Sequence, residues 1–455
     1  MNDSSTIAAV STPVAAGGIG VIRISGENAV AIAAAVFHPV SDKNVTDMKG
    51  YTAAFGKVYD GSTPIDEAVL LIFRAPHSYT GEDVAEISCH GGVYLVDRAL
   101  RAVIRAGARP AAPGEFTKRA FLNGKLDLTE AEAVMNLISA QGEQAASAAL
   151  TALEGALSRK LKETAQILIT DAAYLAAWVD YPDDEIEEIS RDKLLADCRS
   201  VAETLTKLLN NYEGGRALTQ GVDAVIAGKP NVGKSTLMNC LSGYDRSIVT
   251  AAAGTTRDVV EDTVRLGKMV LRLADTAGIR RADDEVEKIG VEFALNRIDR
   301  AELVLAVFDG SQPLSREDHD VIDRCRGKRA IALINKSDLP QQLDPAALND
   351  FFAVIPFCAK TAAGLQELSD AVTAALGSDS VDTSAAMLAN ERQRAGCEQA
   401  LTCVKEAIDA LQTGMTLDAV NVSADAAVDA LLTLTGERAG EAVINEIFSK
   451  FCVGK

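Results

Sequence analysis

The segment that most constrains the fold of this chain is residues 228–235, which read GKPNVGKS. It fits the pattern G-x-x-x-x-G-K-[ST], in which glycines let backbone N–H groups surround phosphate oxygens at the start of a helix. Residues 222–227 (VDAVIA) before it are typical of a short buried strand, and residues 236–241 after it are typical of a helix. Lys234 would reach the outer phosphates and the Ser235 hydroxyl would ligate Mg²⁺. The sequence therefore predicts a strand, a phosphate-binding loop and a helix, in that order.

Three later segments indicate which nucleotide binds: residues 254–258 (GTTRD), 275–278 (DTAG) and 335–338 (NKSD). The Asp338 carboxylate can accept two hydrogen bonds at once, and guanine offers an adjacent ring N–H and amino group, so GTP is favoured over ATP. The Thr256 hydroxyl would close on Mg²⁺ and the Gly278 N–H would turn towards the outer phosphate. Both loops lose a partner after hydrolysis, and they are therefore the candidate switches.

Apolar runs at residues 269–274, 303–308, 331–334 and 354–357 predict further strands of a parallel sheet. Loops at the carboxyl edge of such a sheet form its ligand site. The last of these strands leads into residues 358–360 (CAK), which we expect to contact the base, with Cys358 where GTPases usually carry Ser.

The residue after the second switch motif is Ile279, where Ras-like enzymes carry a Gln that orients the attacking water. An apolar side chain cannot polarise water, so either hydrolysis is very slow or another group takes that role. The charged residues that follow closely are Arg280, Arg281, Asp283, Asp284, Glu285 and Glu287. The local pattern does not choose among them.

Length and composition indicate a multidomain globular protein. A chain of 455 residues suggests about three domains. No apolar run approaches the roughly 18 residues that span a membrane, and the first residues lack the basic start of a secretory signal, so we expect the chain in the cytoplasm. The eight cysteines form no C-x-x-C pair, which argues against a zinc site or a disulfide framework. The net charge of −19 opposes nonspecific binding to nucleic acid, so any RNA contact should be local or shared with a partner.

The order of patterns along the chain predicts three kinds of structure. Short β-branched runs with Gly and Pro punctuation predict an α+β domain over residues 1–121. Helical periodicity follows, with Thr129 and Glu132 as a candidate capping box, and residues 210–215 interrupt it before the phosphate-binding loop. Residues 377–380 read as a linker, after which helical pattern returns. We therefore predict an α/β P-loop GTPase domain, residues 219–377, inserted between two parts of an α-helical central domain, residues 122–218 and 378–455.

These features together resemble the MnmE (TrmE) tRNA-modification GTPases over essentially the whole chain. The resemblance is carried by the four nucleotide-binding segments, Asn231, Ile279 and the final residues FCVGK. The first domain adds residues 18–26 (GIGVIRISG), 79–83 (YTGED), 90–92 (HGG) and 113–128 (PGEFTKRAFLNGKLDL).

The resemblance implies that the first domain forms a homodimer and binds a tetrahydrofolate derivative, in the 5-formyl or 5,10-methylene form. The matching folate positions are Arg23, Glu86 and Lys125, with Lys455 close by. Arg and Lys can pair with an anionic, carbonyl-bearing ligand, and a Glu can accept hydrogen bonds from a pterin edge.

The resemblance also assigns the catalytic groups of the GTPase domain. A potassium ion takes the place of an arginine finger and is held by oxygens matching Asn231, Thr250, Ala252 and Thr255, while Ser235 and Thr256 hold Mg²⁺. Glu287 matches the general acid/base. The expected nucleotide contacts are Asn231, Val232, Gly233, Lys234, Ser235, Thr236, Thr250, Ala251, Ala252, Ala253, Gly254, Thr255, Thr256, Asp275, Thr276, Ala277, Gly278, Asn335, Lys336, Asp338, Cys358, Ala359 and Lys360.

The larger reaction implied is a carboxymethylaminomethyl-type addition at carbon five of the tRNA wobble uridine, carried out with the flavoprotein MnmG. A one-carbon unit comes from the folate and an amine follows. Cys452 is a candidate participant because a thiolate can act as a nucleophile. The alternative is an Era-like switch in RNA or ribosome assembly, which would need neither the folate positions nor Cys452.

Overall fold

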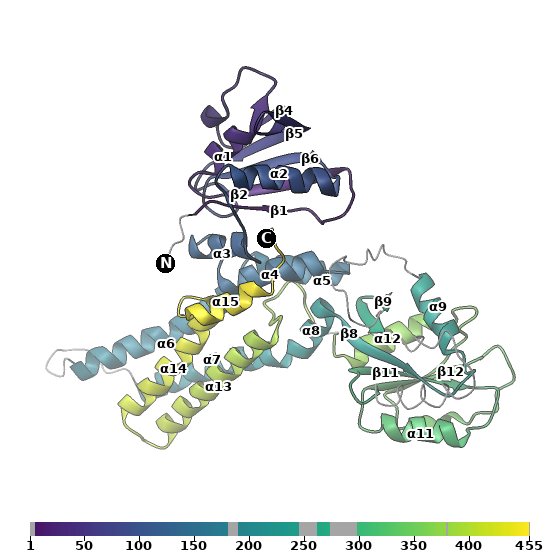
Figure 1. Cartoon of the computed structure of the whole chain (residues 1–455). Coiled ribbons are helices and arrows are strands. Elements are labelled where there is room, and N and C mark those ends of the chain that lie inside the picture. Colours follow the sequence, from purple (N-terminus) through teal and green to yellow (C-terminus); the bar gives the residue numbers. More distant parts are fainter. Residues whose placement is uncertain (1–4, 181–189, 245–261, 274–297, 379–380, 455) are drawn as a thin grey trace. The chain divides into compact units, whose positions relative to one another are not determined.

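The computed structural model describes residues 5–180, 190–244, 262–273, 298–378 and 381–454 (Figure 1). Contacts divide the chain into two compact units, Met1–Met135 with Asp429–Lys455, and Asn136–Val428. Helix α14 (Leu417–Thr435) carries the chain from the second unit into the first.

The first unit is built on a seven-stranded sheet of order β3-β4-β5-β6-β2-β1-β7. Its strands are β1 (Ile7–Val10), β2 (Ile19–Ser25), β3 (Phe37–Pro39), β4 (Thr52–Asp60), β5 (Thr63–Phe73), β6 (Val84–His90) and β7 (Arg109–Pro110). Helices α1 (Ala29–Val36) and α2 (Val93–Arg105) cover one face, where Ile22, Ile24 and Leu70 join the core, and the short helix η1 (Val45–Asp47) packs beside α1. Alternate residues of β1 face the other way and pack with Phe116 of α3 (Glu115–Leu122). The predicted α+β fold is confirmed.

Helix α4 (Leu128–Ser139) begins two residues earlier than the predicted capping box implies. The cap is Asp127, whose Oδ1 accepts from the N–H groups of Thr129 (2.9 Å) and Glu130 (3.0 Å), while Glu130 Oε2 accepts from Asp127 N (2.8 Å). The prediction of Thr129 with Glu132 was therefore wrong, because an Asp two residues earlier caps the same turn with a Glu at the matching spacing. At the other end of the chain, α15 (Glu441–Ser449) packs through Phe448 against Leu128.

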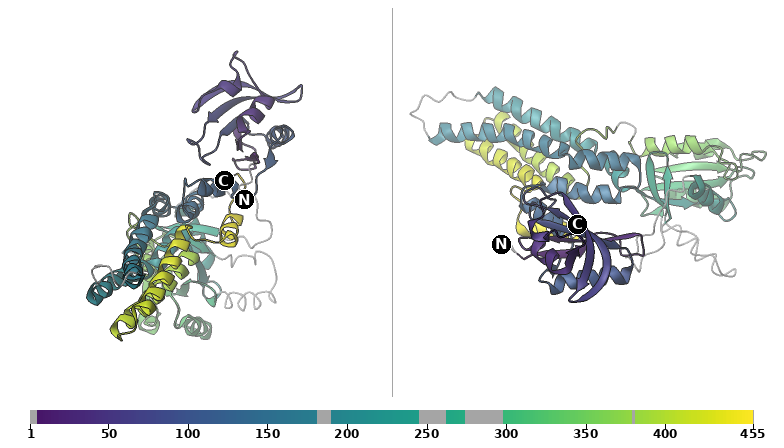
Figure 2. Two further views of the ribbon diagram at one scale, coloured as in Figure 1. Left: turned by 90° about the vertical axis from the view of Figure 1, so that its left-hand side faces the viewer. Right: turned by 90° about the horizontal axis from the view of Figure 1, so that it is seen from above.

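The helices of the second unit come from both sides of the nucleotide-binding segments. They are α5 (Glu143–Leu153), α6 (Ala156–Asp180), α7 (Arg191–Asn210), α8 (Tyr212–Gln220), α13 (Glu391–Gln412) and the first part of α14. Helix α7 packs against both α6 and α13, and Figure 2 shows these long helices side by side. The predicted insertion of the GTPase domain into a helical domain is thus confirmed. In the described part of the chain, no helix is both long and apolar enough to cross a bilayer.

Residues 210–215 do not end the helical structure as expected. They turn the chain at Asn211 and open α8, which includes Gly214 and Gly215. A Cβ on Gly214 would lie 2.7 Å from the Gly377 carbonyl oxygen and 2.7 Å from Val381. The glycine there permits a close approach of the linker to the helix, so it reflects packing and not a break.

The nucleotide-binding segments lie on a six-stranded sheet of order β13-β12-β11-β8-β10-β9. The strands are β8 (Val222–Ala227), β9 (Asp262–Leu266), β10 (Met269–Leu273), β11 (Leu303–Asp309), β12 (Ala330–Asn335) and β13 (Ala353–Pro356), all parallel except β9. Helix α11 (Arg316–Cys325) packs on one face, and α9 (Lys234–Tyr244) and α12 (Leu365–Ala375) on the other. A short helix, η2 (Pro345–Leu348), precedes β13. Each strand predicted in this domain is present.

Candidate nucleotide-binding site

The phosphate-binding loop joins the end of β8 to the start of α9, and two glycines define its path. Gly228 has φ 151° and Gly233 has φ 101°, both in the region that favours glycine. A Cβ on Gly228 would lie 2.4 Å from the Val307 carbonyl oxygen, and one on Gly233 would lie 2.3 Å from Asn335 Nδ2. Larger residues would push the loop away from the sheet. The backbone therefore forms the narrow cradle that phosphate oxygens need.

The lysine of this loop is held at the cradle by the loop itself. Lys234 Nζ donates to the carbonyl oxygens of Gly228 (2.8 Å) and Lys229 (2.7 Å). Ser235 and Thr236 follow in the first turn of α9, where backbone N–H groups favour an anion. Asn231 has φ 62° and an exposed side chain, which leaves its amide oxygen open for a ligand.

Asn335 connects the phosphate loop to the loops expected to read the base. Its Nδ2 donates to the Val232 carbonyl oxygen (2.7 Å), and its Oδ1 accepts from Ala359 N (3.0 Å). The side chain is buried at the carboxyl end of β12. One amide therefore holds three loops in register, a position that only a side chain with both a donor and an acceptor can fill.

Asp338, the carboxylate expected to read the base, has a thiol as its neighbour. Cys358 Sγ lies 3.4 Å from Asp338 Oδ1 and can donate to it, in the position where Ser was expected. Cys358 is buried, whereas Lys360 beside it is exposed. The thiol therefore does more than pack, since it constrains the orientation of the carboxylate.

Lys336 makes an ion pair that the sequence analysis did not identify. Its Nζ lies 2.6 Å from Asp309 Oδ2, at the end of the neighbouring strand β11. Burial works to raise the pKa of Asp309, but hydrogen bonds from Lys336 and Ser311 outweigh it and hold that pKa below its usual value. An Asp directly after the apolar run 303–308 was the available signal, because the carboxyl ends of parallel strands meet at the ligand site.

The remaining predicted nucleotide contacts lie outside the described residues. They are Thr250, Ala251, Ala252, Ala253, Gly254, Thr255, Thr256, Asp275, Thr276, Ala277 and Gly278, together with the proposed acid/base Glu287. Their roles stay predictions. So does the set of Mg²⁺ and potassium ligands, of which only Ser235 and Asn231 are described.

In the first unit, two of the predicted folate residues lie against each other. Arg23 on β2 and Glu86 on β6 are cross-strand partners, and Arg23 Nε lies 2.8 Å from Glu86 Oε1. The Arg23 guanidinium also lies over the rings of Tyr79 (5.5 Å) and Phe116 (5.7 Å). Lys125 Nζ donates to the Pro76 carbonyl oxygen (3.2 Å), in the same loop that carries Tyr79.

The carboxyl-terminal tail returns to this sheet. Gly114 N donates to the Cys452 carbonyl oxygen (3.2 Å), and Ser11 Oγ donates to the Gly454 carbonyl oxygen (3.3 Å). The Cys452 side chain is exposed, and Lys455 lies outside the described residues. The tail therefore ends beside β1, the strand next to the one that carries Arg23.

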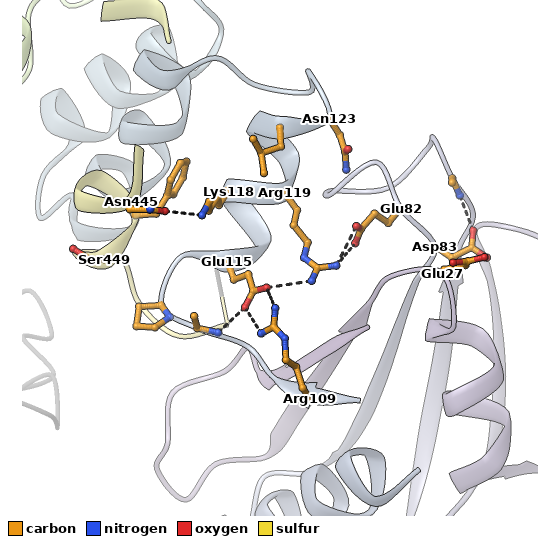
Figure 3. A pocket seen from close by; sticks show the side chains of 15 residues that line it. Glu27, Glu82, Asp83, Arg109, Glu115, Lys118, Arg119, Asn123, Asn445 and Ser449 are labelled. Carbon is orange, nitrogen blue, oxygen red and sulfur yellow. Dashed lines mark hydrogen bonds and ion pairs between the residues drawn. The ribbon is translucent and has the colours of Figure 1, made fainter. Parts of the chain in front are cut away.

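A separate cavity of about 790 Å³ lies between α3, α15 and the loops of the sheet (Figure 3). A chain of charges lines it, in which Arg109 pairs with Glu115, Glu115 with Arg119, and Arg119 with Glu82. Burial works to raise the pKa of Glu115, but hydrogen bonds from Arg109, Ala112 N and Arg119 lower it. Arg23, Glu86 and Lys125 do not line this cavity. Glu82, Glu115 and Arg119 lie in the segments 79–83 and 113–128 that carry the family resemblance, but no role was predicted for them from the sequence.

Comparison with known proteins assigns the family. Residues 6–125 match the model described as GTP-binding protein TrmE N-terminus, and residues 128–452 match that of the MnmE helical domain. Proteins named tRNA modification GTPase MnmE are similar over the full chain. That of Acetivibrio thermocellus is 40% identical over 464 residues (100% of both chains), that of Geobacillus kaustophilus 38% over 462 residues (100% of both), and that of Lacticaseibacillus paracasei 40% over 456 residues (99% and 98%). With both models matched and this identity over its whole length, the chain belongs to the MnmE family.

Proposed function

We propose that this chain, a GTP hydrolase that acts in tRNA modification, is activated by potassium and modifies carbon five of the wobble uridine together with MnmG. The observation that carries the proposal is the likeness of this chain to MnmE relatives from end to end. The buried Asn335, which ties the phosphate loop to the loop expected to read the base, supports the nucleotide site on which the proposal depends. The modification would be of the carboxymethylaminomethyl type. We propose that the protein acts in the cytoplasm.

The potassium proposal rests on two features of the second unit. Ile279 cannot orient water, and the exposed amide of Asn231 projects from the phosphate loop, where a cation ligand is expected. A cation held there would supply positive charge against the charge that develops as the phosphoryl group is transferred. Glu287 would then serve as general acid/base, and Ser235 with Thr256 would hold Mg²⁺.

The one-carbon proposal rests on Arg23, Glu86 and the tail. The Arg23 guanidinium lies between an acid and two aromatic rings, which is a surrounding suited to a flat, polar ring such as a pterin. The proposed ligand is a tetrahydrofolate derivative in the 5-formyl or 5,10-methylene form, held also by Lys125 and Lys455. Cys452 is exposed at the end of the tail and is proposed to take part in the chemistry.

A homodimer is proposed through the first unit. Phe55 and Val69 are cross-strand partners, and both are exposed, on the face of the sheet opposite α1 and α2. A paired, exposed aromatic and β-branched residue on an open sheet face favours a protein partner. tRNA contact would be shared with MnmG, in keeping with the acidic charge of this chain.

GTP turnover in potassium and in sodium chloride tests the catalytic part of this proposal. We expect turnover to rise when potassium replaces sodium, and to fall about a hundredfold or more in Glu287→Ala, because a general acid/base is lost. Binding of GDP to that variant should be unchanged. Glu285→Ala is the matched control and should hydrolyse GTP normally. Equal rates in the two salts would rule out the cation mechanism.

A further inference from the structure

A buried ion pair joins the phosphate-binding loop to α11, the helix that follows the neighbouring strand β11. Lys229 Nζ lies 2.6 Å from Asp318 Oδ2 and 3.3 Å from Ser315 Oγ. The Lys229 side chain is 13% exposed and that of Asp318 is 3% exposed. A lysine is seldom this buried unless it is paired with an opposite charge, and here Asp318 provides that charge.

The Asp318 carboxylate is held in place by its own helix cap, independently of Lys229. It is the third residue of α11 in a capping box, and its Oδ2 accepts from Ser315 N (2.8 Å) and Ser315 Oγ (2.8 Å). Its other oxygen, Oδ1, is buried and has no hydrogen-bond partner among the residues that the structure describes. A buried carboxylate is costly without a counter-charge, and Lys229 provides it. The helix thus offers a rigid anionic anchor to the loop.

Lys229 also helps to hold Lys234, the lysine expected to contact the phosphates. The carbonyl oxygens of Gly228 and Lys229 accept from Lys234 Nζ, so the position of Lys229 sets where that ammonium lies. We propose that Lys229 and Asp318 are a positioning pair, which holds the first arm of the phosphate loop so that its N–H groups and Lys234 meet the phosphates of the nucleotide.

The base side of the site has an anchor of its own. Lys336 pairs with Asp309 at the end of β11, and Gly310 N donates to the Asn335 carbonyl oxygen (2.9 Å). The two anchors lie at opposite ends of the β11–α11 connection, and each fixes a different loop. Loss of the Lys229–Asp318 pair should therefore weaken phosphate binding and leave the reading of guanine unchanged.

Equilibrium binding of GDP and inosine diphosphate to the whole chain tests this pair. Inosine diphosphate lacks the amino group of guanine that Asp338 would read. We expect Lys229→Met to raise the Kd of both nucleotides by about tenfold, which corresponds to the loss of about 1.4 kcal/mol. The ratio of the two Kd values should stay that of the unchanged chain. Lys229→Arg should restore both Kd values to within about twofold, because it keeps the charge.

Two further variants separate positioning from folding. Lys328→Met removes the same charge from an ion pair with Asp299 (3.4 Å). Lys328 lies just before β12, at the amino end of the parallel strands and away from the nucleotide site, so this variant should bind GDP normally. Lys229→Met/Asp318→Asn removes the uncompensated carboxylate, so it should recover the thermal stability lost in Lys229→Met but not the affinity. Unchanged GDP binding in Lys229→Met, a changed ratio of the two Kd values, or recovered affinity in the double variant would each overturn the proposal.

Discussion

At the scale of single residues, the helical domain contains an acid whose surroundings oppose its charge. Asp171 on α6 is buried, and its Oδ2 has no hydrogen-bond partner within the described part of the chain. Desolvation, and then the nearby Asp197, raise its pKa to about 6, although Lys193 works in the opposite direction. Cys198 next to Asp197 is affected in the same way, and burial raises its pKa to about 11. Ionisation of Asp171 therefore destabilises the folded state.

Asp171→Asn should stabilise the chain at neutral and alkaline pH. The pKa of Asp171 in the folded protein lies above that of a free aspartate, so as the pH falls the folded protein takes up this proton first. The cost of ionising Asp171 is therefore fully present above about pH 6. We expect a gain of about 2 kcal/mol at about pH 8 that shrinks through pH 6 and vanishes near pH 4. Thermal unfolding followed by circular dichroism measures it. Glu163→Gln, an exposed acid on α6, is the control, and an equal gain at about pH 5 would contradict the explanation.

At the scale of elements, α8 provides a matched pair of glycines that separates packing from helix propensity. Gly214→Ala would place a Cβ 2.7 Å from a backbone oxygen, whereas Gly215→Ala would place it 3.5 Å from the Met387 sulfur, an ordinary contact. We expect Gly214→Ala to cost about 1–3 kcal/mol through overpacking, and Gly215→Ala to stabilise by up to about 1 kcal/mol. Thermal unfolding of both variants tests this expectation. If both variants were more stable than the unchanged chain, the linker would have to move away from the added Cβ at little cost.

Helix α8 also shows which secondary-structure elements could be predicted from the sequence and which could not. Strand β11 was predicted because a continuous apolar run between charged residues has few other uses, and β8 because a short, mostly apolar run lies between two glycines. The start of α8 was mispredicted because a Gly pair can serve close packing as well as a break. The cap of α4 was mispredicted because Asp127 and Thr129 can both cap a helix, and each has a Glu three residues later. The position of Asp309 after an apolar run was a usable signal, whereas Asp318 could not be assigned from the sequence, because its partner Lys229 lies 89 residues away.

At the scale of the whole molecule, one chain carries two proposed sites, one in each of the two units. Arg23 belongs to the unit that includes both ends of the chain, and Lys234 belongs to the other. The insertion was predictable because helical pattern stops and resumes around the nucleotide-binding segments. The return of the tail was not, since the contact of Ser11 with Gly454 spans 443 residues and no local pattern records it. If both sites serve one reaction, loss of either should abolish it.

Mass spectrometry of tRNA nucleosides from cells that lack this chain tests that dependence. We expect the group at carbon five of the wobble uridine to disappear and to return when the unchanged chain is supplied. Lys234→Ala should fail to restore it, because the phosphates lose their ammonium partner, and Arg23→Ala should fail because the proposed folate site loses its cation. Lys328→Met should restore it fully. Normal wobble uridine in the deletion strain would exclude the proposed reaction, whereas recovery with Arg23→Ala alone would exclude only the folate site.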